Sequence, residues 1–102
     1  MRTSTIAKQL SGGQGSEFAQ ALGREIRERR QALGMSQAAA GRPLSRAFLS
    51  SVERGRLTPS LPSLLIIARQ LSTSAGTILA SVEQKLEATD DDGDPDQTGL
   101  AR

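Results

Sequence analysis

The strongest constraint on the fold is a set of serines that each precede a short segment with helical spacing of apolar residues. These residues are Ser16, Ser36, Ser45, Ser60 and Ser74. A serine hydroxyl at such a position accepts a hydrogen bond from a free N–H of the first helical turn, so serine favours a helix start. No segment shows the strict alternation of a strand. The pattern predicts an all-α fold of five short helices.

Glycine and proline residues indicate where these helices end. Gly34 and Gly55 each follow an apolar segment, and glycine readily adopts the left-handed conformation that closes a helix. Pro43 disfavours helical geometry at the residue before it, so the second helix is expected to end near Arg42. Pro62 is tolerated because it falls in the first turn of the fourth helix, where its missing N–H costs little.

The apolar residues of the segments define the expected core. Aromatic residues make up only 2% of the chain, so this core must be aliphatic. The side chains concerned are Phe18, Leu22, Ile26, Phe48, Leu49, Val52, Leu64, Leu65, Ile67, Leu71, Ile78, Leu79 and Val82. The fourth segment holds more apolar residues than one helix face needs. We expect most of them in the core, and the surplus, together with the fifth helix, could also form a dimer surface.

Composition shifts along the chain suggest one small domain with polar ends, because 102 residues allow little more. Residues 1–15 are polar and glycine-rich, which predicts a flexible arm. Residues 16–84 would form the compact helical domain. Residues 85–102 are acidic and cannot bury apolar surface, which predicts a disordered tail.

The net charge of +2 is unevenly distributed. Residues 16–82 hold nine arginines against four glutamates, and residues 83–102 hold two basic against seven acidic residues. A basic body suits a polyanionic partner, although the same charges also favour solubility. The tail could be merely solvated, could compete with a polyanion for the basic body, or could bind a basic partner.

Several classes of site are excluded by composition. The chain contains no cysteine or histidine, so it offers no disulfide, no Cys or His zinc ligand and no Ser/His or Cys/His catalytic pair. We expect no metal site, no cofactor and no enzymatic activity. No apolar run is long enough to cross a bilayer, and the first residues do not resemble a secretory signal. We therefore expect a cytoplasmic protein without a membrane partner.

Ser36 to Gly55 is the segment most informative about function. It predicts two short helices joined by a tight turn, with a polar outer face on the second helix. That outer face comprises Arg46, Ala47, Ser50 and Ser51. Arginine can bond guanine, serine can donate or accept, and alanine can touch a thymine methyl, so the face suits the major groove of DNA. The pattern alone fits an ordinary solvated helix face equally well.

Several segments together resemble the Cro/CI-type helix-turn-helix family, also called XRE-like or lambda-repressor-like. They are Ile26-Arg27-Glu28-Arg29-Arg30, Gly34-Met35-Ser36-Gln37, the stretch from Leu44 to Gly55, and Thr58-Pro59-Ser60-Leu61. The resemblance covers about residues 20–82, and the order and spacing of the segments are its specific feature. It implies a compact five-helix DNA-binding domain that binds operator DNA as a homodimer and controls transcription; we expect the control to be repression.

The resemblance also implies roles for individual residues. Candidates for contact with DNA bases are Arg46, Ala47, Ser51 and, more weakly, Ser50. Candidates for contact with DNA phosphates are Gln37, Ser45, Arg54 and Arg56, of which Ser45 is first of all a helix cap. Arg30 and Glu53 match a family pair that joins the first helix to the end of the third, which is a structural role.

The chain departs from the family pattern in and around its second helix. The motif is about two residues shorter than usual near Arg42-Pro43, Ala40 stands where leucine is common, and Gly41 stands where alanine is common. Arg29 also replaces a frequent leucine. A small residue at a core position leaves space unless its neighbours close in. The second helix is thus expected to be short and poorly filled.

These observations lead to one main functional hypothesis and one alternative. The main hypothesis is a sequence-specific regulator that binds double-stranded DNA through the helix starting near Ser45. The alternative is a protein-interaction module or an antitoxin component with a degenerate helix-turn-helix, whose partner would be a toxin or another protein. The shortened second helix is the main support for this alternative.

Overall fold

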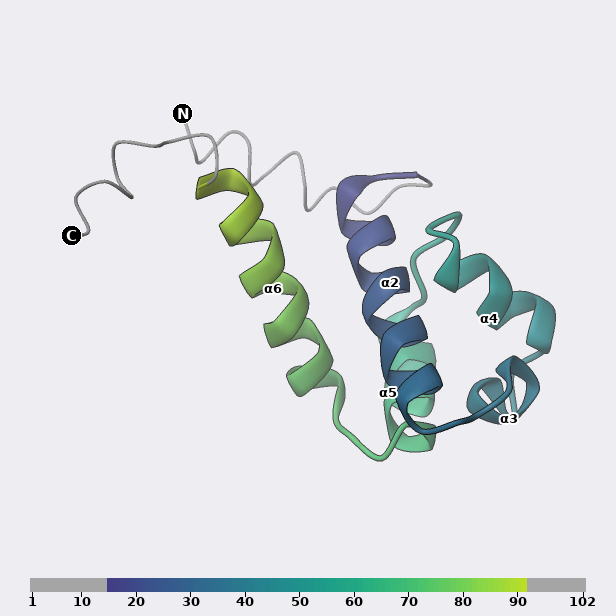
Figure 1. Ribbon diagram of the computed structural model, residues 1–102. Coiled ribbons are helices and arrows are strands. Elements are labelled where there is room, and N and C mark those ends of the chain that lie inside the picture. The colour runs from purple at the N-terminus through teal and green to yellow at the C-terminus, as the bar shows by residue number, and fades with distance from the viewer. Residues whose placement is uncertain (1–14, 92–102) are drawn as a thin grey trace.

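The computed structural model describes residues 15–91, which form five helices and no strand (Figure 1). The helices are α2 (Glu17–Ala32), α3 (Gln37–Gly41), α4 (Arg46–Glu53), α5 (Leu61–Gln70) and α6 (Ala75–Asp91). The all-α, five-helix prediction is confirmed. Most of the expected arm and residues 92–102 of the expected tail lie outside the described residues.

Each of the five serines caps the helix that follows it, as predicted. In every case the serine Oγ accepts a hydrogen bond from the backbone N–H three residues later, at 3.0–3.2 Å. The donors are the N–H groups of Ala19, Ala39, Phe48, Ser63 and Thr77. The helix starts are therefore fixed by local chemistry that repeats along the chain.

The predicted helix ends are also confirmed. Gly34 and Gly55 adopt φ values of 68° and 73°, the left-handed region that favours glycine. Arg42, just before Pro43, leaves helical geometry with ψ of 144°. The turn between α3 and α4 is thereby limited to the four residues 42–45.

The helices enclose one aliphatic core, to which α2 is central. α6 runs beside α2 on one side, while α3 and α4 lie on the other and α5 lies behind (Figure 1). The largest fully buried side chains are Leu22, Ile26, Leu49, Val52, Ile67, Ile78 and Val82. The buried sides of α2, α4, α5 and α6 all point into this core, so the orientation of α4 depends on the whole domain.

The last helix is longer than expected. The predicted tail began at residue 85, but α6 continues to Asp91. Leu86 follows Ile78 and Val82 at intervals of four residues and is only 7% exposed, so it extends the same buried stripe. The burial of Leu86 moves the end of the domain beyond residue 84.

The core prediction is confirmed for Ile78 and Val82 of the fifth helix, so these two residues are not available for the alternative role as a dimer surface. Ile78 and Val82 are fully buried within the core of their own chain. The core assignment of Leu65 is wrong, because this residue is 59% exposed. Leu61, one turn earlier on the same helix, is 68% exposed. Periodicity could not separate the two sides of α5, since apolar residues occur almost all round it.

Small residues in α3 allow this short helix to pack closely on α4. Ala40 is fully buried, and a Cβ atom at Gly41 would stand 3.3 Å from the Cβ of Leu49. A side chain at position 41 would therefore press against Leu49.

No single helix in residues 15–91 is long and apolar enough to span a bilayer. α5 and Ala75–Ala88 reach that length and composition only together, across a bend of 101°. The described residues also hold no group of three acidic, histidine or cysteine side chains placed to bind a metal ion.

Candidate nucleic-acid interface

α4 has one buried side and one accessible side. Leu49 and Val52 are fully buried against the core. Arg46 and Ala47 are exposed on the opposite side, and Ser50 and Ser51 are half-buried beside them. The structure therefore gathers the four predicted base-contact residues on one short helical surface, and no large apolar side chain lies among them.

α3 and α4 form the two arms of a tight helical motif. Residues 42–45 connect them, and the N–H of Leu44 donates to the carbonyl oxygen of Gly41 at 2.6 Å. Gln37 begins α3, and Ser45 stands immediately before α4. Two predicted phosphate-contact residues thus lie at helix N-termini, where partial positive charge favours an anion.

A buried ion pair connects α2 to the end of α4. Arg30 Nε donates to Glu53 Oε2 at 2.6 Å, and Arg30 Nη2 donates to Glu53 Oε1 at 3.0 Å. The Glu53 side chain is 1% exposed and that of Arg30 is 13% exposed. The hydrogen bonds to Glu53 raise the pKa of Arg30 above its ordinary value, although burial acts in the opposite direction. The structure brings together the two residues that the resemblance paired.

The same ion pair also holds the start of α3. Gln37 Nε2 donates to Glu53 Oε1 at 3.0 Å, and Arg30 Nη1 donates to the carbonyl oxygen of Met35 at 2.9 Å. These contacts fix α2, α3 and α4 relative to one another. The Gln37 amide carries a second N–H, which is not used by Glu53 and can serve a phosphate oxygen.

The remaining phosphate candidates follow the last turn of α4. Arg54 caps the helix and Arg56 lies just after Gly55, and both side chains are exposed. No described residue forms an ion pair with either of them. Their charges are therefore available at the edge of the α4 surface.

Sequence reasoning missed a second buried carboxylate, which ties α6 to α2. Glu25 is 5% exposed and accepts hydrogen bonds from Arg29 Nε at 2.6 Å, Lys85 Nζ at 2.8 Å and Ser81 Oγ at 3.1 Å. Burial alone would raise the pKa of Glu25, but these hydrogen bonds outweigh it and lower the pKa. The bond to Arg29 gives this arginine a function at a position where the family often has leucine. The four-residue spacing of Glu25 and Arg29 was a visible signal, whereas the link to α6 was not.

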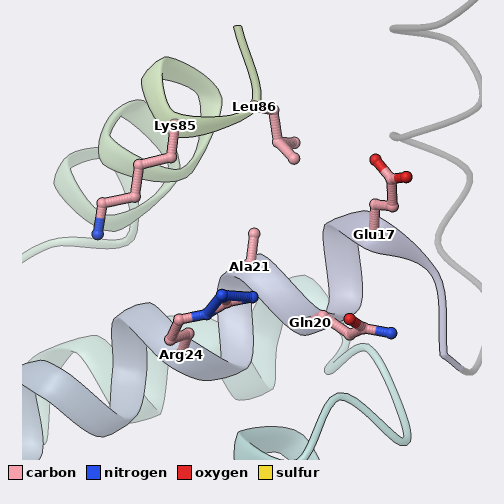
Figure 2. A pocket seen from close by; sticks show the side chains of 6 residues that line it. All are labelled: Glu17, Gln20, Ala21, Arg24, Lys85 and Leu86. Carbon is pink, nitrogen blue, oxygen red and sulfur yellow. The ribbon is translucent and has the colours of Figure 1, made fainter. Parts of the chain in front are cut away.

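An open cleft of about 400 Å³ lies between α2 and the end of α6. Figure 2 shows Ala21 of α2 and Leu86 of α6 pointing towards each other, with Glu17 at one end. Gln20, Arg24 and Lys85 complete the lining. Its lining residues offer no nucleophile beside a base, so the cleft does not have the composition of a catalytic site.

Two short helices joined by a tight turn, the second with an accessible polar side, define a helix-turn-helix DNA-binding domain. The family model described as helix-turn-helix domain matches residues 21–78, more than half of the chain. The chain belongs to this family and is of the Cro/CI, or XRE-like, type. It is accordingly a DNA-binding transcription regulator and not an enzyme.

Solved structures with the same fold include two named regulators. The restriction-modification controller protein C.AhdI from Aeromonas hydrophila is 31% identical, with a TM-score of 0.56 over 59% of this chain and 94% of the controller. The clp gene regulator ClgR from C. glutamicum is 26% identical, with a TM-score of 0.61 over 67% of this chain and 91% of the regulator. No curated protein sequence gives a significant match.

Proposed function

We propose that the protein is a sequence-specific repressor that places α4 in the major groove of operator DNA. The accessible side of α4, with Arg46, Ala47, Ser50 and Ser51 together, is the observation that carries this proposal. Arg46 would bond guanine, Ala47 would contact a thymine methyl, and the serines would donate to or accept from base edges. The names of C.AhdI and ClgR, a controller and a gene regulator, support the regulatory role.

Phosphate contacts would hold α4 in register on the duplex. Gln37 and Ser45 lie at the starts of α3 and α4, and Arg54 and Arg56 follow the end of α4. Contacts of this kind fix the register and orientation of a protein on the duplex without reading its sequence.

We also propose that two copies bind together on a near-palindromic site. Two α4 helices related by a two-fold axis would then lie about 34 Å apart, one turn of DNA. The exposed side chains of Leu61 and Leu65 on α5 support this, because paired burial would remove them from water.

The test is a selection of bound duplexes from a random DNA pool, followed by affinity measurements on the selected sequence. We expect a near-palindromic site for the unmodified protein. Arg46→Ala should weaken binding by about 1–3 kcal/mol and relax the preference at one base position. Glu83→Ala, which removes an exposed side chain of α6, serves as the control and should leave the preference unchanged.

Two outcomes would count against the proposal. A loss for Arg46→Ala that is equal on all sequences would make Arg46 a phosphate contact. Absence of binding to any duplex at low salt would remove the DNA-reading function and favour a protein-interaction role.

A further inference from the structure

A second surface hollow lies where α2 meets the end of α4. It has a volume of about 390 Å³ and is lined by Gln20, Arg24, Arg27, Glu53 and Arg54. Gln20, Arg24 and Arg27 follow one another at helical spacing along α2, and Arg54 is the C-terminal cap of α4. Three guanidinium groups from two helices thus border one small space, which we call the arginine hollow.

The positive charge of the arginine hollow is not neutralised within the described part of the protein. Glu53 is the acidic residue of its lining, but this carboxylate is buried and already bonded to Arg30 and Gln37. No described residue forms an ion pair with Arg24, Arg27 or Arg54. An anion entering the hollow would therefore meet free guanidinium groups, which bind phosphate oxygens in pairs.

The arginine hollow is adjacent to the accessible side of α4. Arg54 follows Ser50 by four residues, which places it one helical turn, about 5.4 Å, further along the same side. A helix that meets bases through its first residues has its last turn towards the DNA backbone. The hollow lies at that last turn, with Arg24 and Arg27 beside it on α2.

We propose that the arginine hollow binds a backbone phosphate of the duplex that α4 reads. Arg24 and Arg27 then become DNA contacts, which extends the interface from the helix-turn-helix onto α2. The inference rests on the proposed function, because it requires α4 to lie in the groove. Free inorganic phosphate offers the same chemistry, but the open shape of the hollow and its position beside α4 favour a phosphate carried by the duplex.

The main test measures how DNA affinity depends on salt concentration for the full chain. A duplex selected from the random pool is titrated at several NaCl concentrations with the unmodified protein and the Arg24→Gln/Arg27→Gln variant. Each lost phosphate contact lowers the slope of log affinity against log salt by about 0.9, so we expect a slope reduced by about one to two. The affinity for random duplexes should fall by the same factor, since a phosphate contact carries no sequence information.

Two control variants make the result specific. Glu83→Gln changes one exposed charge on α6 and should leave the slope nearly unchanged. Arg24→Lys/Arg27→Lys retains both charges and should restore most of the slope. Melting curves by circular dichroism should show that all variants remain folded. Equal slopes for Arg24→Gln/Arg27→Gln and the unmodified protein would overturn the proposal.

A second experiment separates the duplex from free phosphate. Inorganic phosphate is added to the unmodified protein and to Arg24→Gln/Arg27→Gln, and thermal unfolding is followed. We expect phosphate to cause no saturable rise in Tm that is lost in Arg24→Gln/Arg27→Gln. If such a rise occurs, and the two substitutions leave the salt dependence of DNA binding unchanged, the hollow binds a free anion and not the duplex. Failure of the unmodified protein to bind any duplex would instead overturn the proposed function, and the inference with it.

Discussion

Gly23 of α2 lies directly against the main chain of Val52 at the end of α4. A Cβ atom on residue 23 would collide with the carbonyl oxygen of Val52 and stand 2.6 Å from that of Glu53. The two helices approach each other so closely only because residue 23 has no side chain. This contact and the Arg30–Glu53 pair together fix the position of α4 relative to α2.

Replacement of Gly23 by alanine should force α2 and α4 apart. We expect Gly23→Ala to lower the free energy of unfolding by about 1–3 kcal/mol, as overpacking of a rigid contact does, and to weaken DNA binding. Urea denaturation measures the first effect. Gly76→Ala is the matched control, because the nearest atom to a Cβ there is Ser74 Oγ at 3.9 Å, and it should be neutral or slightly stabilising. Equal effects of the two substitutions would contradict this account of Gly23.

Loss of Arg30 should be more harmful than loss of its exposed neighbour Arg27. Arg30→Ala leaves the Glu53 carboxylate buried without its main partner, which should cost about 3–5 kcal/mol of stability. Arg27→Ala removes an exposed side chain and should cost far less. Thermal unfolding compares them, and equal shifts in Tm would show that the pair contributes little to holding α4.

The contribution of Glu25 to the free energy of unfolding should depend on pH. Its pKa is lowered below the ordinary 4.5, because hydrogen bonds from Lys85, Arg29 and Ser81 outweigh the effect of burial. A lowered pKa means that the unfolded chain binds the proton more readily, so the contribution is complete above pH 4.5 and is lost as the pH falls through the folded pKa.

We expect Glu25→Gln to reduce stability by about 1–2 kcal/mol at neutral pH, since all three donors to Glu25 are at least partly exposed. The difference in the free energy of unfolding between Glu25→Gln and the unmodified protein should become smaller below pH 4.5. Urea denaturation over a pH series measures it. Glu28→Gln, which changes a 58% exposed side chain, is the control and should have little effect at any pH. A difference for Glu25→Gln that does not vary with pH would contradict the role of its charge.

Leu65 should matter for self-association and not for folding. Leu65→Glu places a charge in the proposed contact between two copies. Leu65 is 59% exposed in a single copy, so the substitution should not disturb the fold. We expect a lower apparent mass by sedimentation and an unchanged circular dichroism spectrum. Leu33→Glu, at a residue that is 50% exposed beyond the end of α2, should not change the mass. A dimer that persists in Leu65→Glu would place the contact elsewhere.

Much of the fold could be predicted because its boundaries depend on local chemistry. The serine caps and the positive φ of Gly34 and Gly55 involve neighbours within a few residues, so the sequence alone reveals them. The extent of α6 was also readable, since Leu86 continues the spacing of Ile78 and Val82. The acidic composition that follows concealed this signal.

The features that were missed depend on contacts between distant residues. Gly23 looks like any helix glycine until Val52 is placed against it, and Glu25 looks like a surface glutamate until α6 brings Lys85 to it. The Arg30–Glu53 pair was expected only through family resemblance. Periodicity reports which residues share a helix side, but not which side another helix will cover.

The Arg30–Glu53–Gln37 connection uses none of the residues on the accessible side of α4. The buried framework and the four proposed base-contact residues of α4 can therefore change independently during evolution. Residues 46, 47, 50 and 51 could be exchanged in a library to obtain new operator preferences, while the buried partners keep the same helix in the same place.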